Sequence, residues 1–384
     1  MRSANRFNSP RLYIVSQIIR KMIASRVILI GLIYAVYIIN SVAGSGSHSG
    51  DDQCAADDDD GVYSLTDSEI LSIIYSKCSG KHWPKENRTN WMSKKSVCFW
   101  SGVTCSATDD DGGQSVVTAL DLSYHHLSCT LPGSVFKLQN LQSLDVSNNP
   151  KLTMSFTEIT YANCLQKLDM SSTGSTSISG IGYAPYLDYL KMSNTYLPNA
   201  LNEMGTLAVS YLYMSNCRTK GIIPEGFYGD IDDEEYDDHI FMDISNNYLT
   251  GTLPYEFSRF TNLYLLADDN MFSGMDSYLC NMTDWNDGMV GNFGCDAIMC
   301  PKGTFNELGR MYGSSGIACE PCKRAVYYGS VECRKKTMSR TGSHPFTGFL
   351  VFVVGMCGAI FIVKRLWGTL NNNFDFEQHG GLYS

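Results

Sequence analysis

Short apolar segments recur through the middle of the chain at nearly constant spacing. Each opens with alternating apolar and polar residues, as in VTALDLS from Val117 and LQSLDVS from Leu141. Alternation of this kind predicts a short β-strand with one buried face. One such segment cannot bury its own apolar face, so the pattern predicts stacked repeats that share a core. When the second apolar residue is aligned, seven copies follow at steps of 24, 24, 22, 22, 30 and 23 residues. The seven register residues are Leu120, Leu144, Leu168, Leu190, Leu212, Met242 and Leu265.

A second recurrent position lies five residues after each register residue, where the strand must give way to a turn. We expect its side chain to hydrogen-bond to the backbone of the adjacent repeat, because buried amides need partners. His125 suits this role poorly, as expected beside the end of a stack, and Cys217 is expected to be a buried free thiol. The seven turn residues are His125, Asn149, Thr173, Thr195, Cys217, Asn247 and Asn270.

Three repeats also carry an apolar residue followed by proline on the returning side of the coil. These pairs are Leu131-Pro132, Ile223-Pro224 and Leu253-Pro254. The wording resembles the plant-type leucine-rich repeat, LxxLxLxxNxLxGxIP. The resemblance implies an α/β solenoid with a parallel sheet on its concave face and extended or 3₁₀ segments on its convex side. The middle repeats lack the Gly-Pro pattern, so their convex side stays open.

The residues before the first repeat predict a cap. Thr66 and Glu69 match a capping box, and the apolar residues from Ile70 onward predict a short helix that starts near Asp67. The segment CFWSGVTC, from Cys98 to Cys105, resembles the N-terminal cap of plant-type leucine-rich-repeat proteins. Its aromatic residues are expected to cover the end of the solenoid.

A cysteine-rich segment follows the last repeat. It contains CPKGTFNELGR from Cys300 and CEPC from Cys319, and it resembles a module of diatom and oomycete leucine-rich-repeat surface proteins. That resemblance implies an extracellular recognition or adhesion role. Fourteen cysteines occur in the chain, and setting aside Cys217 and Cys357 leaves twelve that could form six disulfides.

Cys98 and Cys105 are expected to form a local disulfide. The module would need three disulfides, whose connectivity stays open. A zinc or redox site at Cys319 and Cys322 is the alternative, which an extracellular location disfavours. The module cysteines are Cys280, Cys295, Cys300, Cys319, Cys322 and Cys333.

Both ends of the chain predict membrane targeting. A basic stretch, the apolar run Val27–Ile39 and small residues near Ala43 match a signal peptide, with an uncleaved signal anchor as the alternative. Residues 346–363 are uncharged and mostly apolar, long enough for a transmembrane helix. A cleaved leader and one span predict a single-pass type I plasma-membrane protein. Basic residues 334–340 on the outer side would favour the reverse orientation.

These observations define the expected domain organisation. The 30-residue step coincides with the acidic segment 230–238, which is expected to be a solvated loop, with calcium binding as the alternative. The predicted boundaries are 1–43 signal peptide, 44–64 acidic Gly/Ser linker, 65–116 N-terminal cap, 117–279 seven repeats, 280–335 cysteine-rich module, 336–345 juxtamembrane segment, 346–363 transmembrane helix and 364–384 cytoplasmic tail.

The charge of the chain disfavours nucleic acid as a partner. The net charge is −10, and residues 44–345 carry 21 basic and 37 acidic residues, which gives −16. A non-specific nucleic-acid binder needs a basic face instead. Asn87 and Asn281 lie in glycosylation sequons within the two capping regions.

Residues on either side of each register residue should point out of the concave sheet. In the last four strands these residues are largely aromatic, which predicts a ladder that suits a peptide or a sugar. Cross-strand stacking that only steadies the sheet is the alternative. The aspartates of the LDLS wording are expected to be structural. The candidate ligand contacts are Tyr189, Tyr211, Tyr213, Phe241 and Tyr264.

Function is therefore expected to be recognition rather than catalysis. We find no nucleophile elbow, zinc-protease motif or phosphate-binding loop, and His125-His126 has no third ligand at metal spacing. No cofactor or metal is expected. No kinase signature follows the predicted span, so a receptor would signal through a membrane co-receptor. The hypothesis is a receptor-like protein with a peptide, protein or polysaccharide ligand. A structural or adhesion glycoprotein of the wall or surface coat is the alternative.

Overall fold

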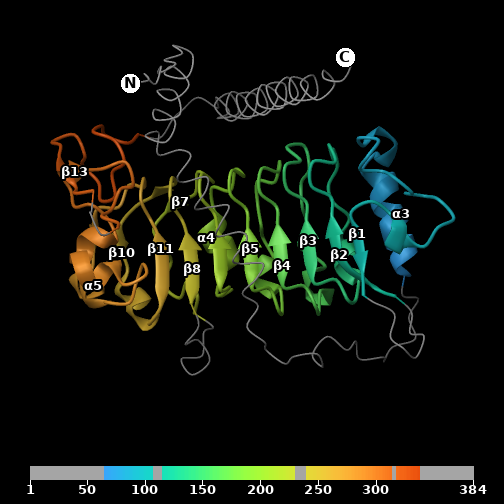
Figure 1. The fold of residues 1–384 in the computed structure, drawn as a ribbon, viewed down its shortest axis with the longest axis horizontal. Helices are drawn as coiled ribbons and strands as arrows, with labels where there is room; N and C mark the ends of the chain where they lie inside the picture. Colours follow the sequence, from blue (N-terminus) through green and yellow to red (C-terminus); the bar gives the residue numbers. More distant parts are fainter. Residues whose placement is uncertain (1–64, 107–114, 230–238, 314–316, 338–384) are drawn as a thin grey trace, which may run out of the picture. The chain divides into compact units, whose positions relative to one another are not determined.

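The computed structural model describes residues 65–106, 115–229, 239–313 and 317–337, which form a row of stacked coils (Figure 1). The predicted leader, linker, transmembrane segment and tail lie outside the described residues, as does the acidic insertion 230–238. Within the described ranges, no helix combines the length and apolar character required to cross a bilayer.

An eight-stranded sheet runs along the stack in the order β1-β2-β3-β4-β5-β6-β8-β11 (Figure 1). Seven of its strands are the predicted repeat strands, and they pair in parallel with the predicted register, as in Leu120 with Leu144 and Met242 with Leu265. The repeat pattern does not include β1, which belongs to the cap and runs antiparallel to β2. The strands are β1 Val103–Cys105, β2 Val117–Asp121, β3 Ser143–Asp145, β4 Lys167–Asp169, β5 Tyr189–Lys191, β6 Tyr211–Tyr213, β8 Ile240–Asp243 and β11 Leu263–Leu266.

The register residues form a continuous core beneath the sheet. All seven are essentially inaccessible to solvent and belong to one apolar cluster that reaches from Ile70 to Met299. Truncating a buried leucine of this kind to alanine typically destabilises a domain by about 2–5 kcal/mol. The repeats are therefore held together mainly by this shared core.

The turn residues form the predicted hydrogen-bonded column. The Asn149 amide donates to the carbonyl oxygen of Leu122 at 2.8 Å, and its Oδ1 accepts from the Leu127 amide at 2.9 Å. Thr195 and Cys217 fill equivalent positions, and the Cys217 thiol donates to the Met192 carbonyl oxygen at 3.1 Å. Cys217 is buried and free, as predicted.

The returning side of the coils is built mostly from short 3₁₀ turns. One middle repeat, whose convex side the sequence left open, forms the short helix α4 instead. Two small parallel sheets, β7 with β9 and β10 with β12, lie on this side of the last three repeats, of which two carry the Gly-Pro pattern. The elements are η3 Gly133–Lys137, η4 Ile159–Tyr161, η5 Ile181–Tyr183, α4 Ala200–Met204, β7 Lys220–Gly221, β9 Tyr248–Leu249, β10 Thr252–Leu253, η6 Tyr255–Arg259, β12 Gly274–Met275 and η7 Ser277–Asn281.

The N-terminal cap begins with the predicted helix, α3 (Asp67–Lys77), and both hydrogen bonds of its capping box are present. Helix α3 is followed by the turns η1 (Gly80–His82) and η2 (Val97–Phe99). Trp83 and Trp91 pack edge to face at 5.0 Å, and Trp91 contacts Trp100 at the same distance. These aromatic side chains cover the end of the apolar core.

The cysteine-rich module closes the other end of the stack. It contains α5 (Met289–Phe293), η8 (Gly294–Ala297) and the antiparallel pair β13 (Thr304–Phe305) and β14 (Glu320–Pro321). Asn286 covers the outer edge of β11: its amide donates to the Leu263 carbonyl oxygen at 3.0 Å, and its Oδ1 accepts from the Leu265 amide at 2.7 Å.

Five disulfides join the described cysteines. Cys98 pairs with Cys105 as predicted, and the module pairs are Cys280–Cys295, Cys300–Cys319 and Cys322–Cys333. The fifth, Cys78–Cys129, ties helix α3 to the first repeat. Of the twelve cysteines expected to pair, Cys54 lies outside the described residues and Cys164 is buried, so the sixth disulfide stays a prediction.

Candidate functional site

The side chains on either side of the register residues form two rows across the concave sheet. Strand pairing places Tyr189, Tyr211, Phe241 and Tyr264 in one row, and Lys191, Tyr213 and Asp243 in the other. Neighbouring strands lie about 4.8 Å apart, so side chains of one row are within contact distance. The predicted aromatic residues are therefore brought together on four adjacent strands.

The aromatic rings form a continuous ladder. Ring centroids are 5.4 Å apart for Tyr189 and Tyr213, 4.7 Å for Tyr213 and Phe241, and 5.4 Å for Phe241 and Tyr264. Tyr211 joins the ladder through Tyr189 at 6.0 Å. Stacked or tilted pairs at these distances typically stabilise a structure by about 0.5–1.5 kcal/mol each. The ladder thus steadies the sheet, and whether it also binds a ligand stays a prediction.

The members of the ladder differ in accessibility. Tyr189, Tyr211 and Tyr213 are half-buried and present part of each ring to solvent. Phe241 is only 7% exposed, so the expectation that it forms part of an exposed stripe is wrong. Its position between Tyr213 and Tyr264 makes it the interior of the stack. The accessible aromatic surface is therefore centred on strands β5 and β6.

The cysteine-rich module determines the surroundings of Tyr264, the ladder residue on the last strand, β11. Tyr264 lies beside Arg310, and burial raises the pKa of its hydroxyl to about 12. The Arg310 guanidinium lies 3.2 Å from the Asp268 carboxylate, and both side chains are largely buried. Burial raises the pKa of Asp268 to about 6, although Arg310 acts to lower it. Tyr264 is thus enclosed by a polar cluster that the sequence did not reveal.

The aspartates of the first strands have a structural role. Asp121, Asp145 and Asp169 each accept a hydrogen bond from the backbone amide two residues later, at 2.8–2.9 Å. Asp169 also forms an ion pair with Lys191 at 3.1 Å. Burial raises the pKa of Asp145. These contacts fix the turns after the strands and leave a polar surface next to the aromatic one.

His125 occupies its turn position through contacts with the cap. Its ring nitrogens lie 2.8 Å from the Ser123 carbonyl oxygen and 3.1 Å from that of Asn87, and its ring packs edge to face on Trp83 at 5.0 Å. Burial lowers its pKa. The described part of the chain contains no cluster of three or more His, Cys, Asp or Glu side chains suited to a metal ion.

The two sequon asparagines lie in different environments. The Asn87 amide nitrogen donates to the Tyr124 carbonyl oxygen at 3.3 Å and lies 3.2 Å from the His125 ring, so the side chain is half-buried. Asn281, at the end of η7, is exposed. Glycosylation of either residue stays a prediction.

Comparison with known proteins agrees with this geometry. Residues 240–260 match the family model described as Leucine Rich Repeat. Receptor-like protein 30 of Arabidopsis thaliana is 42% identical over 67 residues, which are 17% of this chain and 8% of that protein. Nodulation receptor kinase of Pisum sativum is 34% identical over 85 residues, 22% of this chain and 9% of the kinase. The chain thus spans less than a tenth of the length of either relative.

Among solved structures, a plant ice-binding protein aligns with a TM-score of 0.45 at 23% identity, over 56% of this chain and 66% of that one. The parallel repeat strands and the turn column define a leucine-rich-repeat solenoid. Short parts of the chain are similar to receptor-like proteins of Arabidopsis thaliana.

Proposed function

We propose that this protein is a cell-surface receptor-like protein that binds an extracellular peptide on the concave face of its solenoid. One observation carries the proposal: Tyr189, Tyr211 and Tyr213 share a contiguous, half-exposed aromatic surface on β5 and β6. Tyrosine offers a large ring and a polar hydroxyl with little loss of side-chain entropy, which makes it common in binding hot spots.

The surroundings of this surface favour a peptide. The Asp169–Lys191 ion pair borders the tyrosines on one side, and its side chains are partly exposed. A peptide can stack an apolar side chain on the rings while its charged groups contact this pair. A neutral polysaccharide would contact the rings but would offer no charged group to either member of this ion pair.

Membrane anchoring and signalling complete the proposal. Residues 346–363 would anchor the chain, and a membrane co-receptor would transmit the signal. The support for anchoring and for a co-receptor is the similarity of part of this chain to receptor-like proteins.

The test begins with the purified full-length chain on arrays of peptides and glycans. We expect retention by a narrow set of peptides. Broad retention by polysaccharides, with no peptide selected, would contradict the receptor proposal and favour the adhesion alternative.

The captured peptide then tests the site. Substituting Tyr189→Ala, Tyr211→Ala and Tyr213→Ala together should weaken binding by at least about 30-fold, because hot-spot truncations cost about 2 kcal/mol or more. The matched control substitutes three exposed tyrosines of the returning side, Tyr161→Ala, Tyr183→Ala and Tyr278→Ala. Equal binding by both triple variants, with unfolding midpoints confirming the fold, would place the ligand elsewhere.

A further inference from the structure

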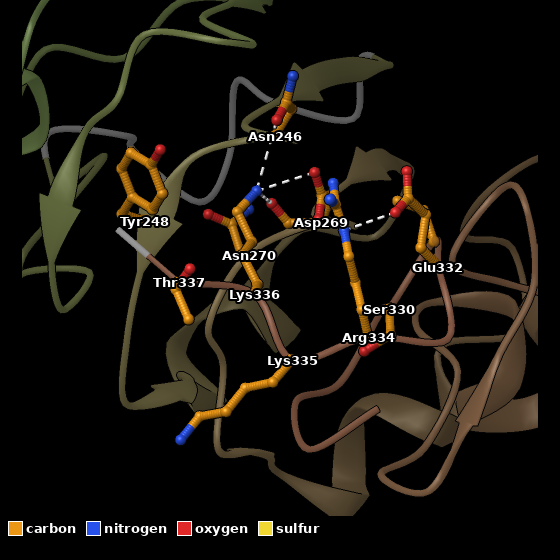
Figure 2. Close-up of a pocket in the computed structure, with 11 residues that line it drawn as sticks. Asn246, Tyr248, Asp269, Asn270, Ser330, Glu332, Arg334, Lys335, Lys336 and Thr337 are labelled. Atoms are coloured by element: carbon orange, nitrogen blue, oxygen red, sulfur yellow. Dashed lines mark hydrogen bonds and ion pairs between the residues drawn. The ribbon is translucent and has the colours of Figure 1, made fainter. Parts of the chain in front are cut away.

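A second candidate site, polar rather than aromatic, lies where the strands of the last two repeats end in their turns. It is a pocket of about 350 Å³ between two repeat turns and the final described segment of the chain before residue 338. Figure 2 shows the residues that line it. Asn246, Tyr248 and Asp269 belong to the turns, while Ser330, Glu332 and Lys336 belong to the module. The predicted juxtamembrane segment starts at 336, yet here the chain still contacts the solenoid.

The Lys336 ammonium is the centre of this site. Its Nζ lies 2.8 Å from the Asp269 carboxylate, 2.5 Å from the Asp269 carbonyl oxygen and 3.4 Å from Asn246 Oδ1 (Figure 2). The same Nζ lies 5.4 Å from the centre of the Tyr248 ring, within cation–π range. The side chain of Lys336 is only 17% exposed although its two neighbours are exposed.

The number and arrangement of acceptors suit a primary ammonium. A lysine head group has three N–H donors, and the site offers three oxygen acceptors and an aromatic face. A guanidinium presents five donors in a planar fork that pairs best with a bidentate carboxylate, which three oxygens from separate groups do not imitate. Burial lowers the pKa of Lys336, opposed by Asp269, so the ammonium is held in a partly desolvated place.

The site exists because the repeats end here. In the interior of the stack, a backbone amide at this turn donates to the next coil, as Asn246 does to the Asp268 carbonyl oxygen at 2.9 Å. Asp269 has no further repeat beyond it, and its amide donates to Gly329 of the module at 2.8 Å. The module thus replaces a missing coil, and Lys336 occupies the acceptors beside it.

We propose that Asn246, Tyr248 and Asp269 form a primary-ammonium site, that Lys336 is its intramolecular occupant, and that this contact holds residues 334–337, which follow the Cys322–Cys333 disulfide, against the last repeats. When residues 334–337 withdraw, the site takes the lysine side chain of another protein.

Chemical complementation tests the site without knowledge of the partner. In the full-length chain, Lys336→Ala should empty the site, and n-propylammonium should then bind at least about tenfold more tightly than to the wild type, because a charge-assisted hydrogen bond contributes about 1.5–3 kcal/mol. Calorimetry or ligand-observed NMR measures this. Lys335→Ala is the matched control, since Lys335 is exposed and only lines the pocket rim.

Two further variants complete the design. Adding Asp269→Asn to Lys336→Ala should abolish the amine binding, and Asp269→Asn alone should increase hydrogen exchange in residues 334–337 with Lys336 still present. No gain in amine affinity on Lys336→Ala, equal binding of n-propylguanidinium, or unchanged exchange in Asp269→Asn would each overturn the proposal.

Discussion

The two ends of the solenoid are closed by different chemistry. The N-terminal end is covered by tryptophans and a buried histidine, which remove apolar surface from water. The C-terminal end also buries apolar side chains, among them Trp285, Ile298 and Met299, and adds two ion pairs, Arg310 with Asp268 and Lys336 with Asp269. Burying apolar surface stabilises directly, whereas a buried ion pair mainly fixes geometry, because desolvation offsets its attraction. We therefore expect both caps to contribute stability, and the ion pairs of the C-terminal module to fix its position in addition.

The largest expected effect is the loss of a cap tryptophan. Trp91→Ala should destabilise the folded protein by about 3–5 kcal/mol, because it leaves a cavity among Tyr75, Trp83 and Trp100. Denaturant unfolding measures the change. Phe99→Ala is the control, since this aromatic residue of the same cap is 67% exposed. Similar losses in both variants would mean that the aromatic cluster is not what closes this end.

The second effect is a pH response at the C-terminal end. The folded-state pKa of Asp268, about 6, is above its unfolded value of 3.8, so its contribution is fully present below pH 3.8 and is lost as the pH rises through about 6. The loss is on the order of 3 kcal/mol, from the size of the shift. Asp268→Asn removes this titration.

The difference in unfolding free energy between the wild type and Asp268→Asn should therefore change across pH 4–6. The wild type should lose stability relative to the variant as the pH rises. A difference that stays constant over this range would show that Asp268 does not titrate between the two states.

The third effect has the opposite sign and belongs to the N-terminal end. Burial lowers the pKa of His125, so its contribution is present above the unfolded pKa near 6.5 and is lost as the pH falls through the lower folded value. His125→Asn, which places the common turn residue at this position, should remove that acid sensitivity. The measurement is the unfolding free energy between pH 7 and pH 5. Unchanged acid sensitivity in the variant would assign it to another group.

The smallest effects concern the two sequons. Asn87→Gln should destabilise the protein by about 1 kcal/mol, because it disturbs hydrogen bonds to Tyr124 and His125. Asn281→Gln should change stability by less than about 0.5 kcal/mol, as for other exposed positions. Unfolding of the non-glycosylated proteins measures both. Equal values would contradict the structural role of Asn87.

Periodic features of the fold could be predicted from the sequence, because stacking identical coils requires the same residue types at the same spacing. A shared core requires the register residues to repeat, so Leu120 to Leu265 could be aligned and the aromatic ladder located. The burial of Phe241 could not be predicted, because it depends on how two neighbouring rings stack over it.

Contacts between distant segments gave weaker signals. Arg310 and Asp268 are 42 residues apart, and Arg310 lies in the module, outside the repeat period. Asp268 lies three residues after Leu265, where the other six repeats have serine, and this departure is its one mark in the sequence. Cys78 and Cys129 were counted as cysteines available for pairing, but spacing alone does not give connectivity. Lys336 could be interpreted from sequence only as a charge near the membrane.

The way in which the sheet edges are covered has a consequence for the behaviour of the protein at high concentration. An open edge of a parallel sheet is a template on which another chain can add its own strand. Strand β1 runs antiparallel along one edge, and Asn286 pairs with the backbone of β11 along the other. In the part of the chain that the structure describes, the sheet thus ends in a three-residue strand on one side and in a paired strand on the other, which disfavours the joining of copies end to end into fibrils.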